Sequence, residues 1–334
     1  MRPVLKKRAL IVTYDYPPCS APGAAVRSQK LVQYLPEFGW DTWVLCRKEH
    51  HLESGAQPNV TRIPTPVSPR FSYQLGAWMW AKRLRSESDT LMREWRPDLI
   101  YASGPPFPHA LAAIRLARNA GVPLAVDFRD SWSLDPHRGG GFLKQSVKSS
   151  LCRWVYPKLE RTVIDAADAV IMNTDSMRRA YAHRLRIPEQ RIHLVPNGFD
   201  ESDFGGDVQR PARPKLELLY CGRFAGIGGR SPEFVLKAVG ALAGKGRELE
   251  LVILGEDSEA LRRNIQRLGI EAHVRSFPPV SNSEAARRMQ LADALVVYQA
   301  PSQNEVTPIA GKTFEDLRSG RPILAIVPPG DKFR

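Results

Sequence analysis

Several patterns that hold metals or dinucleotides are missing from this chain of 334 residues. It contains no Asp-x-Asp, no His-Glu-x-x-His, no Cys-x-x-Cys and no cluster of Cys and His residues. The Pro/Gly loop after the first apolar segment is not Gly-x-Gly-x-x-Gly, so the dinucleotide fingerprint is absent there. These absences exclude a zinc site of the usual spacing. We expect a site with neither a metal nor a cofactor.

Cysteines and long apolar runs are also scarce. The four cysteines are Cys19, Cys46, Cys152 and Cys221. Their wide spacing favours buried thiols in a reducing cytosol over a disulfide framework, and no apolar run approaches the length of a bilayer-spanning helix. The basic N-terminus could begin a signal peptide, but Tyr14, Asp15 and two prolines interrupt its short apolar part, which favours a buried strand. We therefore expect a cytoplasmic protein.

The charge balance is basic, with a formal net charge of +13. Such a surface attracts polyanions, including nucleic acid, anionic lipid and phosphorylated ligands. The arginines are spread along the whole chain, and no purely basic tail occurs, which argues against a nucleic-acid arm. The pattern fits a phosphate-binding cleft together with a surface that faces a membrane.

Apolar runs alternate with helical patterns along the chain, which predicts an α/β fold. "RALIVTY" and "LELVILGE" are typical of parallel strands covered on both faces. The alternation stops around "FDESDFGGDVQRPARPK", where we place the linker. We expect two Rossmann-like, doubly wound domains, 1–205 and 206–334, that face each other across a cleft. The second domain ends directly after a strand and is expected to be incomplete.

Two arginines mark a candidate site in the second half. Arg223 follows the strand "LELLYCG", at the end where open α/β sheets bind ligands. Arg230 closes the glycine-rich stretch that follows. Forked, charge-assisted hydrogen bonds from the two guanidinium groups would suit a diphosphate. The alternative is that both are solvated side chains in a surface loop.

A second candidate site lies in "TPIAGKTFEDLRSG". Lys312 and Glu315 are three residues apart and so share a face of the predicted helix. Gly311 and the residues before it expose backbone donors that would suit phosphate, and Glu315 could accept hydrogen bonds from a ribose diol. The alternative is an ordinary ion pair on a surface helix.

In the first half, "YDYPPCSAPGAAVRSQK" turns from a strand into a helix that starts near Gly23. Glycine allows a ligand to approach the backbone closely, and the N–H groups of a helix start attract anions. The alternative is a plain turn between a strand and a helix.

These segments resemble a retaining glycosyltransferase of the GT-B fold, family 4, which uses nucleotide sugars. "YPPCSAPGAAVRSQKLVQYLPEFGWDTWVL" is similar to the opening strand, loop and helix of that family. "VDFRDSW" is similar to its Asp-x-Arg-Asp segment, and "VPNGFD" to its interdomain Pro-Asn-Gly-x-Asp. "GKTFEDLRSGRPILA" resembles its Lys-x-x-Glu-x-x-x-x-Gly-x-Pro segment. The likeness extends over nearly the whole chain.

The resemblance implies roles for individual residues. Gly23 would lie against the donor phosphates, Arg223 would hold the diphosphate, and Glu315 would bind the ribose. Arg230 stands where the family usually has a Lys-Gly pair and would substitute for it. Hydroxyl groups of the donor sugar would meet backbone amides of the segment Pro308, Ile309, Ala310 and Gly311. His109 would contact the transferred sugar; the alternative is a packing or capping role.

The implied chemistry needs positive charge where the leaving diphosphate develops negative charge. Arg223, Arg230 and Lys312 would supply it together with helix N-termini. The resemblance alone implies retention of configuration and attack from the face of the leaving group. Arg129 and Asp130 end a strand of the first half and could position the acceptor; the alternative is an internal ion pair that shapes the loop.

The acceptor is expected to be a glycan or a lipid-linked molecule of surface polysaccharide or glycolipid assembly. The helical stretch 70–95 carries Phe71, Tyr73, Trp78 and Trp80 beside basic residues, which would suit a membrane interface on the inner face of the cytoplasmic membrane. The alternative is a helix packed on the sheet. "FLKQSVKSSLCRWVYPKLER" is a second basic stretch that could touch anionic lipid.

Two other function classes remain open at this point. A nucleotide-sugar-binding protein with impaired catalysis would share the same sites and would differ in donor hydrolysis without acceptor. A nucleic-acid binder is disfavoured because basic residues are not interleaved with aromatic residues on any predicted exposed strand.

Overall fold

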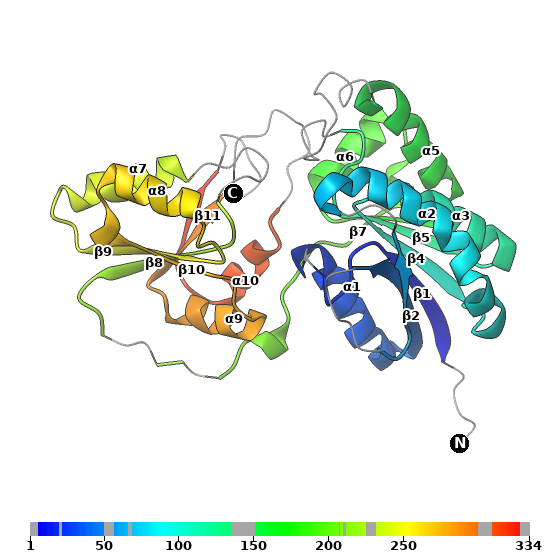
Figure 1. The fold of residues 1–334 in the computed structure, drawn as a ribbon, viewed down its shortest axis with the longest axis horizontal. Coiled ribbons are helices and arrows are strands. Elements are labelled where there is room, and N and C mark those ends of the chain that lie inside the picture. The colour runs from blue at the N-terminus through cyan, green and yellow to red at the C-terminus, as the bar shows by residue number, and fades with distance from the viewer. Residues whose placement is uncertain are drawn as a thin grey trace. The chain divides into compact units, whose positions relative to one another are not determined.

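The computed structural model describes residues 6–19, 22–49, 57–65, 69–134, 151–206, 208–209, 212–224, 232–299 and 309–327. The chain forms two compact units, of which the first ends at Pro196 and the second begins at Asn197. Each unit consists of its own parallel β-sheet with helices packed against it, which confirms the predicted α/β fold class (Figure 1).

The first unit is built on a parallel sheet of seven strands, in the order β3-β2-β1-β4-β5-β6-β7. The strands are β1 (Lys7–Thr13), β2 (Trp40–Lys48), β3 (Val60–Pro64), β4 (Leu99–Gly104), β5 (Leu124–Phe128), β6 (Ala169–Met172) and β7 (Ile192–Leu194). The strand order reverses between β1 and β4, which pair with Ile11 opposite Tyr101. The sequence had predicted six of these strands. It missed β3 because only two of its five residues are apolar.

Helices cover both faces of this sheet. They are α1 (Pro22–Tyr34), α2 (Pro69–Glu94), α3 (Pro108–Ala120), α5 (Tyr156–Ala166) and α6 (Asp175–Arg184), with short turns η1 (Leu35–Phe38), η2 (Leu151–Val155) and η3 (Glu189–Arg191). Successive strand residues point to opposite faces, so Leu10 and Val12 pack with α2, α3, α5 and α6, whereas Ile11 packs on the α1 side. The first helix, α1, is followed at once by the turn η1. It ends at Tyr34, and Pro36, which has no N–H to donate, lies in the turn that follows.

The long helix α2 is packed on the sheet and does not present its aromatic face outward. Trp80 is fully buried in the core, and Tyr73 and Trp78 pack against it partly buried. The prediction that these three side chains lie in a membrane interface is therefore wrong, because the sheet needs their apolar surface to cover it. The side chain of Phe71 lies outside the described residues. No helix in the described parts of the chain is long and apolar enough to cross a membrane.

The second unit has a parallel sheet of five strands in the order β10-β9-β8-β11-β12. The strands are β8 (Leu216–Cys221), β9 (Leu249–Leu254), β10 (Val274–Phe277), β11 (Ala294–Tyr298) and β12 (Ile323–Ile326). The helices are α7 (Glu233–Ala243), α8 (Glu259–Leu268), α9 (Asn282–Leu291) and α10 (Lys312–Arg318), with turns η4 (Glu201–Asp203) and η5 (Glu271–His273). Helices α7 and α8 pack on one face and α9 on the other.

Local sequence signals set the ends of α8. The Ser258 side chain accepts a hydrogen bond from Leu261 N at 3.2 Å, and Gly269 ends the helix in the left-handed region with φ 65°. Serine before a helix and glycine after it are typical of these two positions.

The domain boundary predicted between residues 205 and 206 stays a prediction. Residues 197–205 belong to the second unit by their contacts. The Arg318 guanidinium pairs with the Glu201 carboxylate, and Gln290 Nε2 donates to Gly205 O at 3.4 Å. The segment after Pro196 is thus held by α10 and α9 although the strand pattern resumes only at β8.

Candidate functional site

The reversal of strand order defines one edge position in each sheet. In a doubly wound sheet, ligands bind outside the carboxyl ends of the strands where the order reverses. That position lies between β1 and β4 in the first unit and between β8 and β11 in the second. The predicted site residues are therefore compared with these two positions.

In the second unit, the predicted residues follow the two strands at the reversal. Arg223 comes two residues after β8 and is exposed, and α10 follows β11 in the chain. Between strand and arginine, Gly222 has φ 139°, which strongly favours glycine. Tyr220 Oη donates to Arg223 O at 3.2 Å and fixes the backbone there. The topology thus brings Arg223 and α10 to one edge.

Lys312 and Glu315 form an ion pair at the start of α10. Lys312 Nζ lies 2.6 Å from Glu315 Oε2, and the side chains are 36% and 18% exposed. The alternative that the sequence left open, an i,i+3 ion pair, is therefore present. Such a pair contributes only about 0.5 kcal/mol, so a phosphate and a ribose could separate the two groups at low cost.

The sequence analysis missed a buried carboxylate beside this pair. Asp316 is 6% exposed, and burial, followed by the charge of Glu315, raises its pKa to about 7. Burial also raises the pKa of the Cys221 thiol to about 12, with the Asp316 charge acting in the same direction. Cys221 ends β8, so its coupling to Asp316, Lys312 and Glu315 shows that the start of α10 lies beside the end of β8.

The remaining donor-side predictions are only partly described. Arg230 and Pro308 lie outside the described residues. Ile309 and Ala310 are half-buried, and Gly311 is exposed just before α10. A Cβ added at Gly311 would meet no atom within 4 Å, so the backbone here is open to approach from outside.

In the first unit, Gly23 and His109 follow the strands at the reversal. Gly23 lies in the first turn of α1, after β1, and a Cβ added there would also meet no atom within 4 Å. His109 lies in the first turn of α3, after β4. The topology thus brings both predicted residues to the carboxyl edge of this sheet.

His109 is a buried, neutral imidazole. Its side chain is 1% exposed, and its ring lies 5.7 Å from the Trp80 ring in an edge arrangement. Burial, followed by the charge of Arg129, lowers the pKa of His109 to about 3, while backbone groups of Ser103 and Pro106 act in the opposite direction. Neither ring nitrogen makes a hydrogen bond within the described part of the chain. His109 is therefore suited to hydrogen bonding as a neutral ring and not to carrying charge.

Arg129 shapes the loops of this edge. Its guanidinium donates to the carbonyl oxygens of Gly104 at 3.2 Å, Pro105 at 3.1 Å and Ala24. These carbonyls belong to the loop after β4 and to the start of α1, so one side chain ties together the segments that carry Gly23 and His109. Asp130 is half-buried beside it. The contacts of Arg129 match the loop-shaping alternative, except that its partners are carbonyl oxygens and not the carboxylate of an ion pair. A role of Arg129 in positioning the acceptor stays a prediction.

A second network was not predicted. Arg27 of α1 donates to Asp127 Oδ2 at 2.7 Å and to the carbonyl oxygens of Val195 at 3.0 Å and Pro196 at 3.1 Å. Tyr101 Oη donates to the same Asp127 oxygen at 2.6 Å. Arg27 thereby links α1 and the central strands to the last residues of the first unit. The only sequence signal was an arginine in a helix that otherwise packs on a sheet.

A buried ionic cluster closes the loop after β1. Arg47 is 2% exposed and donates to Asp15 Oδ1 at 2.8 Å and to Glu49 Oε1. Tyr73 Oη donates to Asp15 Oδ2 at 2.6 Å, and the Arg47 guanidinium lies 4.7 Å from the Tyr14 ring centre. Buried charges must be paired in this way to be tolerated. Sequence reasoning could not place them because they come from β2, α2 and the loop.

Comparison with known sequences identifies a family domain in the first unit. Residues 22–198 match the model of the glycosyl transferase 4-like domain, which is more than half of the chain. The chain belongs to the glycosyl transferase 4-like family. The first residue of this match is Pro22, at the start of α1, and its last is Gly198, two residues past Pro196. The glycosyl transferase 4-like domain therefore contains Gly23, Arg27, His109 and Arg129.

Curated relatives of this family member include the D-inositol 3-phosphate glycosyltransferase of Mycobacterium tuberculosis (strain ATCC 25618 / H37Rv). The two sequences are 30% identical over 178 residues, which is 50% of this chain and 35% of the relative. The D-inositol 3-phosphate glycosyltransferase of Mycobacterium bovis (strain ATCC BAA-935 / AF2122/97) matches over the same shares. The match thus spans about a third of the length of these relatives.

Solved structures match both units of this glycosyl transferase 4-like chain. Sucrose-phosphate synthase from Thermosynechococcus elongatus has a TM-score of 0.68 at 15% identity, and the match covers 96% of this chain and 81% of that one. Anabaena HepE in complex with UDP and glucose has a TM-score of 0.63 at 15% identity, with 96% and 80% covered. These likenesses show the fold, which is that of GT-B glycosyltransferases.

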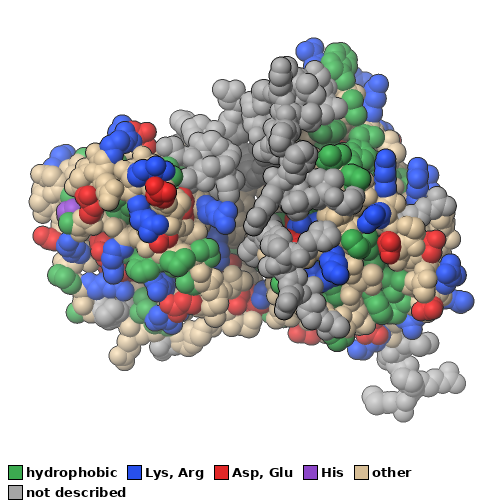
Figure 2. Space-filling model, in the orientation of Figure 1, with side chains coloured by type: hydrophobic (Ala, Val, Ile, Leu, Met, Phe, Trp, Pro, Cys, Tyr) green, Lys and Arg blue, Asp and Glu red, His purple; other side chains and the backbone are tan. Residues whose placement is uncertain are grey.

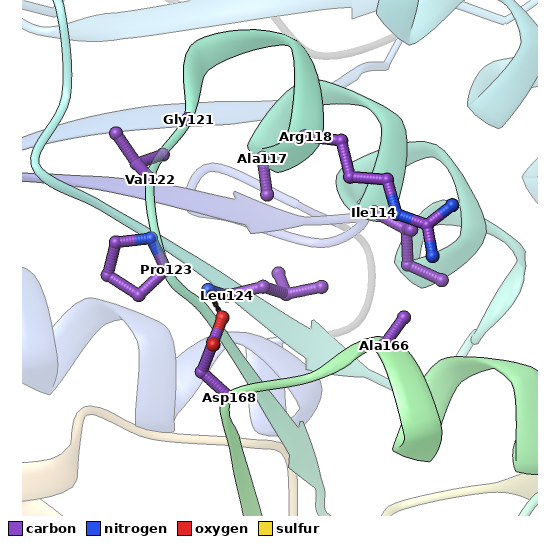
Figure 3. A pocket seen from close by; sticks show the side chains of 9 residues that line it. All are labelled: Ile114, Ala117, Arg118, Gly121, Val122, Pro123, Leu124, Ala166 and Asp168. Atoms are coloured by element: carbon purple, nitrogen blue, oxygen red, sulfur yellow. Dashed lines mark hydrogen bonds between the residues drawn. The ribbon is translucent and has the colours of Figure 1, made fainter.

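Two cavities in the described part of this family member lie away from both edges. One, of about 320 Å³, is lined by Arg118 of α3 and Asp168 near the amino ends of β5 and β6 (Figure 3). Asp168 there accepts a hydrogen bond from Leu124 N at 2.8 Å. The other, of about 490 Å³, lies between α7 and α8. Neither includes a predicted site residue. Among the described residues, no three His, Cys, Asp or Glu gather as metal ligands.

Proposed function

We propose that the chain transfers a sugar from a nucleoside-diphosphate sugar to a glycan or lipid-linked acceptor, with retention of configuration. The observation that carries the proposal is the placement of Arg223 and the start of α10 at the strand reversal of the second sheet. Membership in the glycosyl transferase 4-like family supports the reaction class. The UDP and glucose bound by the structurally similar HepE support the donor class.

In this proposal, the second unit binds the donor. Arg223 and Arg230 hold the diphosphate, backbone amides from Pro308 to Gly311 meet the sugar, and the N–H groups at the start of α10 face phosphate oxygens. Lys312 leaves its pair with Glu315 and turns to the phosphate. The released Glu315 carboxylate then accepts hydrogen bonds from the ribose diol.

The chemical step breaks the bond between the anomeric carbon and the leaving phosphate oxygen. An acceptor hydroxyl attacks the same face, and its proton passes to the leaving phosphate, so charge and atoms balance. Fixed guanidinium and ammonium groups stabilise the developing phosphate charge without reorganisation. His109, neutral as the structure has it, hydrogen-bonds a hydroxyl of the transferred sugar. Gly23 allows the donor phosphates to approach the start of α1.

The first unit would then present the acceptor. Arg129 and Asp130 at the end of β5 lie at the same sheet edge as His109. The acceptor would belong to surface polysaccharide or glycolipid assembly, and the enzyme would be cytoplasmic and attached to the inner face of the cytoplasmic membrane. A nucleotide-sugar-binding protein with impaired catalysis is the competing function; donor hydrolysis in the absence of acceptor would distinguish the two.

A thermal-shift titration tests the donor site. UDP, UDP-glucose and other nucleoside-diphosphate sugars are added to the full chain, and the correct donor should raise Tm with concentration. Glu315→Ala should remove most of the shift, and Arg223→Ala should weaken nucleoside diphosphates far more than a free sugar. Arg263→Ala on α8, an exposed arginine of the same unit, is the matched control and should leave the shift intact. Unchanged donor affinity in Glu315→Ala and Arg223→Ala would overturn the site.

A further inference from the structure

The start of α5 presents an unusual exposed surface in the first unit. Trp154 is 63% exposed and Val155 is 41% exposed, directly before the helix. The Arg153 guanidinium lies 5.2 Å from the centre of the Trp154 ring. Apolar and basic side chains lie next to one another at this end of the unit in Figure 2, where α5 begins in Figure 1. We call Arg153, Trp154, Val155, Lys158 and Arg161 the α5 surface.

The spacing of these residues gives the helix two different faces. Lys158 and Arg161 are three residues apart on α5, which places them on one side of the helix, and both are exposed. Glu160, Val163 and Ile164 are buried on the other side. The acidic residue farther along the outer side, Asp165, pairs with Arg161 at 2.7 Å and lies 3.7 Å from Arg191. Because Arg161 is paired with Asp165, the positive charge nearest to the exposed tryptophan comes from Arg153 and Lys158.

The inner side of α5 is anchored to the segment that follows β5. The Tyr156 ring lies 5.6 Å from the Trp132 ring, and Glu160 Oε1 accepts hydrogen bonds from Trp132 N at 2.7 Å and Ser133 N at 2.9 Å. Trp132 is two residues after Asp130. The α5 surface is therefore held beside the segment that carries Arg129 and Asp130, and both lie in the same unit.

We propose that the α5 surface binds an anionic membrane and brings the edge with Arg129 and Asp130 to a lipid-linked acceptor. An exposed tryptophan flanked by arginine and lysine has the chemistry of the lipid interface, where the ring enters the headgroup layer and the cations meet phosphates. The net charge of +13 adds long-range attraction. The proposal rests on the proposed function for its acceptor, and its binding step can be measured without any reaction.

Vesicle sedimentation of the full chain tests this surface. Vesicles of phosphatidylglycerol and phosphatidylcholine are compared with pure phosphatidylcholine at low and high salt. The chain should bind the anionic vesicles, and salt should weaken binding. Trp154→Ser should lose most binding, and Lys158→Ser should lose about fivefold. Phe38→Ser is the matched control, because Phe38 is 74% exposed on η1 of the same unit and should leave binding unchanged.

The outcomes separate this proposal from the proposed function. Each variant is checked for an unchanged Tm and an unchanged response to UDP-sugars. Trp154→Ser that loses vesicles but keeps the donor response supports the proposal. Wild-type binding to neutral vesicles alone, an equal loss in Phe38→Ser, or full binding in both α5 variants would overturn it. A chain that binds vesicles through Trp154 but never responds to a donor would refute only the proposed function.

Discussion

The two sheet edges differ in how their charged residues are held. In the first unit, Arg129, Arg27 and Arg47 are engaged with carbonyls or carboxylates and are largely buried. In the second unit, Arg223 is exposed, and Lys312 pairs with Glu315 partly in solvent. At the first edge the arginines hold loops in place, whereas at the second edge the cations are exposed enough for a phosphate to reach them. An arginine near a ligand-binding edge is therefore no evidence of ligand binding until its partners are known.

The largest expected effect comes from breaking the fixed edge. Arg129→Ala removes a largely buried guanidinium and its hydrogen bonds to the carbonyl oxygens of Gly104, Pro105 and Ala24, which should lower the free energy of unfolding of the first unit by about 3 kcal/mol. All seven tryptophans lie between Trp40 and Trp154. Tryptophan fluorescence in urea therefore reports the first unit by itself.

The control for this change is Arg115→Ala, an exposed arginine of α3. It should shift the same transition by less than about 0.5 kcal/mol. If Arg129→Ala unfolds at the same urea concentration as wild type and reduces only acceptor use, Arg129 acts on the acceptor and not on the loops.

The contrast between the edges also explains what the sequence could predict. Gly23, Arg223 and Glu315 were predicted as site residues because strand ends, glycines and helix starts follow one another locally. The strand order then places the elements that carry them at the reversal points. The roles of Arg129 and Arg27 depend on carbonyls of Ala24 and Val195, far away in the chain. A single sequence holds no signal for such pairings. The aromatic residues of α2 were misassigned because burial on a sheet and insertion into lipid favour the same amphipathic pattern.

An effect that depends on pH is expected from Asp316 in the second unit. Burial raises its pKa from 3.8 to about 7, so the folded state binds a proton that the unfolded state has released. As far as this group is concerned, the stability of this unit should therefore be greatest below about pH 4 and should fall as pH rises to about 7, by up to about 4 kcal/mol. Asp316→Asn should remove that fall.

The second unit has no tryptophan, so its unfolding is followed by far-UV circular dichroism between pH 4 and 8, after the fluorescence transition is subtracted. Asp257→Asn is the matched control, since this carboxylate is partly exposed and accepts a hydrogen bond from Ser276 at 2.7 Å. The same pH slope in wild type and Asp316→Asn would contradict the assignment.

The smallest effect on stability is expected at the open edge. Lys312→Ala breaks the ion pair with Glu315. The side chains of Lys312 and Glu315 are 36% and 18% exposed, so the loss should lower the free energy of unfolding by only about 0.5 kcal/mol. Donor affinity should fall much more, because the variant loses a cation that faces the diphosphate in the proposed donor complex. The variant also no longer has to separate Lys312 from Glu315, but that gain is only about 0.5 kcal/mol. Lys237→Ala, an i,i+4 pair with Glu233 on α7, is the control for the loss of an exposed pair. Isothermal titration with UDP and with uridine separates a role at the phosphates from a structural role. A loss of affinity confined to UDP would place Lys312 at the phosphates. A loss of stability as large as that of Arg129→Ala, with unchanged affinity for UDP, would show that Lys312 fixes the structure of the second edge as Arg129 does in the first.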